Sequence, residues 1–305
     1  MCFVARMNEI HLSLSKGLGA SGILACILIV MAVCPAKAGT DTDNITPPVT
    51  SNGVIADWLS SVTQIQSEQP HWATPVATVT PRLEQEFRYD QFWEYGRDGK
   101  ELNSFGGGKG YEFIPAQNIE VIVGIPAYET RDNPGGSGGF SDENLLVKYR
   151  ILSANEEQGN YILTAFLGES LPTGSDYNTA HKFVTTPTMA LGKGWGDFDI
   201  QTTLGISVPD VGAPRDQAGT PVAWNTTLQH HLLKYFWPEV EFNYTWYPNG
   251  EHEGLNQLFI TPGMVLGKLV IDKRFGCTIG AGCQLAVTES PTYYHNAILT
   301  VRFPF

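Results

Sequence analysis

Two pairs of carboxylates stand two residues apart in this sequence, each in a segment where polar and apolar residues alternate. They are Asp197 with Asp199 and Glu239 with Glu241. Side chains two apart in a strand point to the same face, so each pair would present two acidic groups together. That arrangement suits general acid–base work. It is equally what the polar face of any strand produces, so the pairs alone do not indicate an enzyme.

A nucleophilic mechanism would need a serine, a histidine base and a polar group that orients the histidine. His230 and His231 point to alternate faces, and Ser207 is the nearest hydroxyl expected on the inward face of the preceding strand. Their spacing matches no lipase or acyltransferase signature. We therefore interpret the chain as a non-enzyme, and an outer-membrane lipid-modifying enzyme is the least favoured alternative.

The sequence indicates neither a metal site nor a cofactor. His181, His252 and His295 fall in predicted loops or at a strand end, with no second ligand at metal-like spacing. Cys277 and Cys283 are six residues apart in one predicted strand, about 20 Å at ~3.4 Å per residue. A disulfide needs Cα atoms within ~7 Å. We expect both cysteines to be small apolar residues on the outward face of that strand.

Long strands are expected to position these side chains. The last thirteen residues, YYHNAILTVRFPF, place apolar and mostly polar residues on opposite faces, as a period of two requires. Most segments of this kind are ten to fourteen residues long, whereas soluble strands have ~5–6 and bilayer-crossing strands ~9–11. The twelve segments are residues 82–95, 100–114, 118–127, 143–152, 160–171, 182–192, 197–208, 222–235, 239–247, 255–268, 275–288 and 293–305.

Aromatic residues collect near the ends of these segments, as in the two interfacial girdles of membrane barrels. The expected connections alternate between long and short, and an even strand number returns both chain ends to one side. The sequence therefore predicts an all-β fold, a transmembrane antiparallel up-and-down β-barrel of about twelve strands, of the bacterial outer-membrane type. A secreted β-sandwich is the alternative fold.

In a membrane barrel the apolar face meets lipid and the charged face lines the lumen. These charges could form a paired network that fills a narrow barrel, or line a pore whose acidic excess disfavours anions. Twelve strands lie between the eight-stranded barrels that side chains fill and open porins of sixteen or more. The predicted lumen-lining residues are Arg82, Glu84, Glu86, Arg88, Asp90, Lys148, Arg150, Asp197, Asp199, His231, Glu239, Glu241 and Arg302.

The first 81 residues precede the predicted barrel. A short apolar run over residues 22–33 and the small-residue pattern Ala36-Lys37-Ala38 predict a secretory signal peptide over residues 1–38, cleaved near Ala38. Residues 39–81 are rich in Thr, Pro and Ser and predict a periplasmic extension with one short helix around residues 54–66. Whether this extension plugs the barrel, which is expected over residues 82–305, stays open.

The chain is acidic, with a net charge of −12. Without residues 1–38 it keeps 16 basic and 30 acidic residues, a net charge of −14. Nucleic-acid binding needs clustered Lys and Arg, so nucleic acid is not an expected partner. The expected partners are outer-membrane lipid and a small-molecule solute.

The terminal strand ends on Phe305, with Phe303 and Val301 on the same face. This strand resembles the β-signal that the barrel assembly machinery of bacteria reads. The resemblance implies that these three residues are an assembly signal and that the assembly machinery is a further partner. It places the chain in the outer membrane of a Gram-negative bacterium.

Several short motifs are shared with a known family. They are Val123-Gly-Ile-Pro126, Lys148-Tyr-Arg150, Leu171-Pro-Thr-Gly174, Thr261-Pro-Gly263 and Leu299-Thr-Val-Arg-Phe-Pro-Phe305. Over roughly residues 82–305 the chain resembles the "MetA-pathway of phenol degradation" family of outer-membrane transporters. The resemblance implies passage of small aromatic or hydrophobic compounds through the lumen, passive or assisted by binding. A structural or surface barrel with a filled lumen is the main alternative.

Overall fold

The computed structural model describes residues 53–96, 99–107, 109–132, 138–175, 178–210 and 219–305. The chain divides into two compact units, residues 1–50 and 51–305, and all described residues belong to the second unit. The predicted signal peptide and its cleavage site near Ala38 lie outside the described residues.

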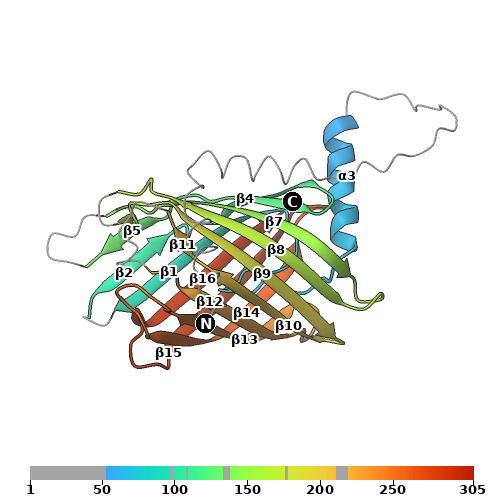
Figure 1. Cartoon of the computed structure of the whole chain (residues 1–305). Helices are drawn as coiled ribbons and strands as arrows, with labels where there is room; N and C mark the ends of the chain where they lie inside the picture. The colour runs from blue at the N-terminus through green and yellow to red at the C-terminus, as the bar shows by residue number, and fades with distance from the viewer. Residues whose placement is uncertain (1–52, 97–98, 108, 133–137, 176–177, 211–218) are drawn as a thin grey trace, which may run out of the picture. The chain divides into compact units, whose positions relative to one another are not determined.

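Twelve antiparallel strands form a closed barrel (Figure 1). Each strand of the ring pairs with the next along the chain, and β16 pairs back with β1 from Glu86↔Pro304 to Tyr95↔His295. The predicted fold is confirmed. The ring strands are β1 (Glu86–Gly96), β3 (Gly110–Ala116), β4 (Ile119–Val123), β7 (Glu143–Ala154), β8 (Tyr161–Leu171), β9 (Val184–Trp195), β10 (Phe198–Ile206), β12 (Val222–His230), β13 (Phe236–Trp246), β14 (Asn256–Val270), β15 (Gly276–Ala286) and β16 (Tyr293–Pro304).

Four short strands continue the ring strands past local breaks. They are β2 (Glu101–Phe105), β5 (Tyr128–Arg131), β6 (Gly139–Phe140) and β11 (Val208–Pro209). β2 pairs with the second half of β1, while β3 pairs with its first half. The break requires glycine at position 110, where φ is +69° and a Cβ atom would lie 2.6 Å from the Val123 carbonyl oxygen.

Four of the predicted element boundaries are wrong. The first strand begins at Glu86 instead of residue 82, because residues 82–85 run inside the barrel. The strand predicted over residues 222–235 ends at His230, and the turn predicted at residues 236–238 belongs to β13, where Pro238 lies opposite Met264. A proline is tolerated near the start of a strand, so it did not mark a turn here. The loop predicted over residues 128–142 contains β5 and β6.

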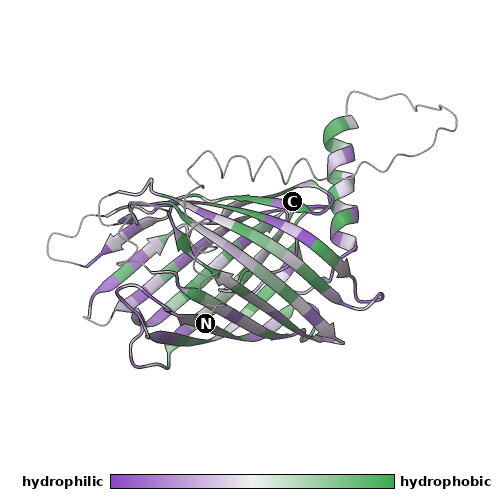
Figure 2. Cartoon of the chain, in the orientation of Figure 1, coloured by the Kyte–Doolittle hydropathy of each residue, from purple (hydrophilic) through white to green (hydrophobic). Residues whose placement is uncertain are grey.

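The two faces of the barrel wall differ in polarity. Figure 2 shows hydrophobic and hydrophilic residues alternating along the strands. On β10 the outward Leu204 is 56% exposed, whereas the inward Asp199 and Gln201 are fully buried. The barrel therefore has an apolar exterior and a polar interior. Among the described residues, no helix combines the length and apolarity needed to cross a membrane.

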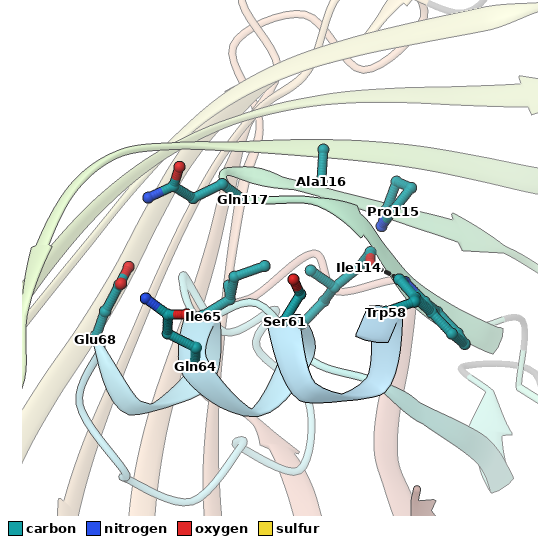
Figure 3. Close-up of a pocket in the computed structure, with 9 residues that line it drawn as sticks. All are labelled: Trp58, Ser61, Gln64, Ile65, Glu68, Ile114, Pro115, Ala116 and Gln117. Atoms are coloured by element: carbon teal, nitrogen blue, oxygen red, sulfur yellow. Dashed lines mark hydrogen bonds between the residues drawn. The ribbon is translucent and has the colours of Figure 1, made fainter. Parts of the chain in front are cut away.

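Within the described residues, the helix α3 (Gly53–Ser67) precedes the barrel. It lies at the end of the barrel where short turns join neighbouring strands at residues 117–118, 155–160, 196–197, 231–235 and 271–275, which we call the turn mouth. The indole nitrogen of Trp58 donates to the Ile114 carbonyl oxygen at 2.9 Å, and Val62 and Ile65 are buried against the rim. Figure 3 shows the small cavity of about 230 Å³ between the helix and the β3–β4 turn. This helix fixes where the following segment enters the barrel.

Candidate functional site

A loop of the chain occupies the lumen. Residues 69–83, which we call the plug, follow α3 and precede β1, so both ends of the loop lie at the turn mouth. The plug residues Trp72, Val76, Thr78 and Thr80 are at most 4% exposed, although they belong to no helix or strand. A loop whose ends are close and whose interior is packed is an Ω-loop. The question left open by the sequence is thus answered for residues 69–81 of the predicted extension.

Carboxylates of the wall bind main-chain N–H groups of the plug. Glu239 accepts a hydrogen bond from the Val76 N–H at 2.9 Å. Glu241 accepts from the Ala77 N–H at 2.7 Å and from the Thr78 N–H at 2.6 Å. The paired carboxylates on β13 therefore act as a clamp on the plug.

Donors of the wall bind the carbonyl oxygens of the plug. Arg302 donates to the carbonyls of Thr74 and Pro75, the latter at 2.6 Å, and Arg88 donates to the Val76 carbonyl at 2.8 Å. Further along the plug, the contacts are Lys148 to the Arg82 carbonyl at 3.0 Å, Thr164 to the Pro81 carbonyl at 2.6 Å and Gln201 to the Ala73 carbonyl at 2.9 Å. The wall thus recognises the main chain of the plug at both its donors and its acceptors.

Inward glycines leave room for two plug side chains. A Cβ atom built on Gly192 of β9 would lie 2.4 Å from the Trp72 ring, and one on Gly194 would lie 2.7 Å from its indole nitrogen. On β15, the corresponding distances from Gly280 and Gly282 to the Val76 methyl carbons are 3.1 and 3.4 Å. The wall is recessed where the plug is bulky, so plug and wall are complementary in shape.

Two charged side chains that bind the plug also form ion pairs with the wall. Arg88 Nε lies 2.8 Å from Asp90, and Lys148 Nζ lies 2.9 Å from Glu120. Burial of an ion pair costs desolvation that only good geometry and further hydrogen bonds repay. Arg88 and Lys148 meet that condition, since each also donates to a plug carbonyl.

Beyond the tip of the plug the lumen is lined by amides. Asn243 donates to Thr78 Oγ1 at 3.3 Å and to the Asn225 side chain at 3.2 Å. Gln284 donates to Asn243 at 3.1 Å and accepts from the Tyr293 hydroxyl at 2.7 Å. The half of the lumen that faces away from the turn mouth therefore begins with an uncharged hydrogen-bonding zone.

The structure brings most of the predicted lumen-lining residues together around the plug. Glu84, Glu86, Arg88, Asp90, Lys148, Arg150, Asp199, Glu239, Glu241 and Arg302 are at most 6% exposed. Arg82 and Glu84 reach the lumen from the plug and its end instead of from a strand. Arg82 donates to the Trp72 carbonyl and lies 3.2 Å from Glu84.

Asp197 was wrongly predicted to face the lumen. It is exposed in the β9–β10 turn, because Gly196, with φ of +59°, starts that turn before the strand begins at Phe198. His231 lies in the β12–β13 turn, where its ring stacks on Trp237 with centroids 4.1 Å apart. Ser207 precedes β11 at the other end of β10, so the serine and the histidine do not form a pair.

Sequence reasoning left the plug as an open question and missed its glycine recesses. The available signal was the Gly-x-Gly spacing at residues 192–194 and 280–282, which removes two consecutive inward side chains from a strand.

Cys277 and Cys283 are free and half-buried. At the terminal strand, Phe303 stacks on Phe87 and Phe275, with centroids 6.4 and 6.0 Å apart. The roles of Val301, Phe303 and Phe305 as an assembly signal stay a prediction.

Comparison with known proteins gives a fold and no family. No protein-family model and no curated protein matches the chain. In all, 33 chains of solved structures match. One is the "COG4313 outer membrane channel from Pseudomonas putida F1", at a TM-score of 0.53 and 11% identity, covering 77% of this chain and 100% of that one. Another is "KdgM porin", at a TM-score of 0.44 and 10% identity, covering 72% and 99%. The likeness to the COG4313 channel supports the barrel fold, and the resemblance to the MetA-pathway family stays a prediction.

Proposed function

We propose that the chain is an outer-membrane channel for small solutes and that its own plug holds the channel closed. The observation that carries this proposal is the topology of the plug, which enters and leaves the lumen by the turn mouth. Because neither end passes through the barrel, the loop can withdraw without unthreading. A withdrawn plug would leave a charged and amide-lined passage.

Opening replaces the hydrogen bonds between plug and wall with hydrogen bonds to water. The plug is held by hydrogen bonds to its main chain, and a hydrogen bond to a charged group contributes about 1.5–3 kcal/mol net, because water replaces the lost partner. The wall carboxylates and guanidiniums would likewise be hydrated by the water that enters. Opening therefore exchanges polar protein partners for water, and it also exposes the apolar cluster that Trp72 and Val76 form with Ile162, Trp237, Val265 and Ile298 of the wall.

The proposed location is the outer membrane of a Gram-negative bacterium, with the turn mouth toward the periplasm. The apolar exterior and the short turns at one mouth support this orientation, since bacterial barrels have short periplasmic turns. Outer-membrane lipid and the assembly machinery would then be partners. A preference for aromatic or hydrophobic solutes rests on the family resemblance alone.

A structural barrel with a filled lumen is the second candidate. The hydrogen bonds between plug and wall favour this candidate, because they are distributed along the plug from Ala73 to Arg82. The two candidates differ in one property, since only a channel ever conducts.

Planar-bilayer recordings on the mature chain test the proposal. A variant with Trp72→Ala and Val76→Ala loses both recessed side chains and should conduct far more often than the unmodified chain. Trp224→Ala is the matched control, because Trp224 is 56% exposed on the outward face, and it should behave like the unmodified chain. Stable insertion with no conductance in the double variant would reject the channel and favour the filled barrel.

A further inference from the structure

A cavity of about 380 Å³ lies beside the plug at the turn mouth. The plug side contributes His71, Trp72 and Arg82, and the barrel side contributes Trp237, Lys268 and Arg302. The cavity thus adjoins the part of the plug that would have to move first during withdrawal.

Two guanidiniums line this cavity, that of Arg302 on the wall and that of Arg82 in the plug itself. Arg302 donates to the carbonyls of Thr74 and Pro75, and Arg82 donates to the carbonyl of Trp72. Within the described part of the chain, the Nε atom of each arginine has no hydrogen-bond partner. Both guanidiniums therefore hold carbonyl oxygens of the plug, Arg82 also pairs with Glu84, and each guanidinium still has an unused donor.

The cavity has an excess of positive charge. Lys234 and Lys268 line it as well, and neither forms an ion pair with any described residue. With Arg82 and Arg302 they make four cations, against the two carboxylates of Glu84 and Glu86. The net charge of the lining is therefore +2 when both histidines are neutral.

One wall of the cavity is flat and aromatic. His231 and Trp237 both line it, and their rings stack with an angle of 8° between their planes. Such a surface can bind a planar or apolar part of a ligand, and the cations beside it can bind a carboxylate group.

We propose that this cavity binds a small carboxylate and that binding releases the plug. A carboxylate can accept two parallel hydrogen bonds from a guanidinium, which a single carbonyl oxygen cannot match in geometry or charge. The bound anion would compete with the carbonyls of Thr74 and Pro75 for Arg302. A ligand shifts an equilibrium only by its preference for one state. The carboxylate prefers the withdrawn state, because Arg302 is then free of the carbonyls of Thr74 and Pro75.

The inference rests on the proposed function, since it supplies the signal that opens the channel. It is tested by the accessibility of the plug tip, which does not depend on conductance. Thr78 is 2% exposed, so a Thr78→Cys thiol should react with a maleimide only when the plug withdraws. The variant is made in the mature chain with Cys277→Ala and Cys283→Ala. The probes are acetate, succinate and benzoate, with benzamide as the neutral counterpart of benzoate.

We expect at least one carboxylate to accelerate labelling about tenfold and benzamide to leave it unchanged. Lys234→Gln and Lys268→Gln should each raise the half-effective concentration of that carboxylate several-fold. Lys273→Gln is the matched control: Lys273 is exposed in the β14–β15 turn and does not line the cavity, so the half-effective concentration should stay the same.

The inference is overturned if none of the three carboxylates accelerates labelling, or if benzamide is as effective as benzoate. Its failure is distinguishable from failure of the channel. Conductance by the Trp72→Ala, Val76→Ala variant together with carboxylate-insensitive labelling would reject the carboxylate site alone. Carboxylate-dependent labelling without any conductance would reject the channel and keep the site.

Discussion

Gln69 and Leu83 exchange two hydrogen bonds at the base of the plug. The Gln69 side chain donates to the Leu83 carbonyl at 2.8 Å and accepts from the Leu83 N–H at 2.9 Å. A side-chain amide thereby replaces the main-chain pairing that a hairpin would have at this point, and both partners are buried. The plug is closed on itself, so it is expected to enter and leave the lumen as one unit.

The Gly192 recess should be sensitive to a single methyl group. In Gly192→Ala the new Cβ would lie 2.4 Å from the Trp72 ring, and overpacking of this kind costs about 1–3 kcal/mol. We expect the thiol of the Thr78→Cys reporter to label roughly tenfold faster, because the penalty applies only with the plug inserted. The rate is measured with a maleimide.

Two variants accompany the Gly192→Ala measurement. Gly205→Ala places its methyl group against Thr188 of the wall and should leave labelling unchanged. In a Trp72→Ala background, Gly192→Ala should have little further effect. Equal effects of Gly192→Ala with and without Trp72 would contradict the proposed recess.

Loss of the Glu241 carboxylate should favour withdrawal of the plug more strongly than Gly192→Ala does. Glu241→Ala leaves the buried N–H groups of Ala77 and Thr78 without partners, and each such group costs about 1–3 kcal/mol. We expect faster labelling of the plug tip and longer open times, with Glu241→Gln intermediate because its amide oxygen still accepts. Glu169→Ala removes a carboxylate that contacts Thr185 of the wall and should not release the plug. Similar labelling rates for Glu241→Ala and Glu169→Ala would argue against the clamp.

The sequence predicted the barrel well because the alternation has a single physical cause. Each strand, such as β10, turns apolar residues outward and polar residues inward. This produces a period of two, which can be recognised in the sequence without knowledge of any tertiary contact. Errors occurred where a local signal was ambiguous, as at Pro238, or where a turn glycine such as Gly196 decided the strand end.

The plug was beyond sequence reasoning for a different reason. Its hydrogen bonds use main-chain groups, which every residue type carries, so Val76 and Ala77 give no sign that Glu239 and Glu241 bind them. The inward charges were expected to pair with one another or to line a pore. Nothing in their spacing indicated that a loop from residues 69–83 would be their partner.

The base of the plug should respond to acid. The main-chain N–H and the ring Nδ1 of His71 lie 2.6 and 2.8 Å from Glu156 in the β7–β8 turn. Partial burial opposes ionisation of Glu156, but the hydrogen bonds from His71 outweigh it and lower the pKa of that carboxyl below its ordinary value. The stabilisation is therefore complete above the ordinary Glu pKa, about 4.3, and is lost as the pH falls through the lower folded value.

Because this pair is largely exposed, its contribution is at most about 1 kcal/mol. We expect labelling of the plug tip to rise modestly, a few-fold, between pH 6 and pH 3 (an acid range chosen around the Glu pKa of about 4.3). Glu156→Gln should flatten this part of the pH profile, while Glu157→Gln, in the same turn, should not. A profile that is unchanged by Glu156→Gln would exclude this contact as its cause.

Deletion of Phe305 should impair assembly of the barrel. The Phe305 N–H donates to the Gln85 carbonyl at 3.2 Å, and its ring is the terminal aromatic of the strand that closes the ring with β1. We expect less heat-modifiable, membrane-inserted protein after expression, with a smaller effect for Phe305→Tyr because an aromatic ring is kept. Normal insertion of the truncated chain would show that the assembly machinery does not recognise the terminal aromatic residue.

The most direct test of the account is a disulfide that locks the plug to the wall. A Cβ atom on Gly282 would lie 3.4 Å from a Val76 methyl carbon, close enough for an S–S bond of about 2.05 Å. Val76→Cys with Gly282→Cys is made in the Cys277→Ala, Cys283→Ala background, and the cross-link is verified by mass spectrometry. Single-channel conductance of the mature chain is then recorded before and after reduction. The account predicts a silent oxidised barrel that conducts once the disulfide is reduced. Equal conductance in the two states would contradict the claim that the plug closes the channel.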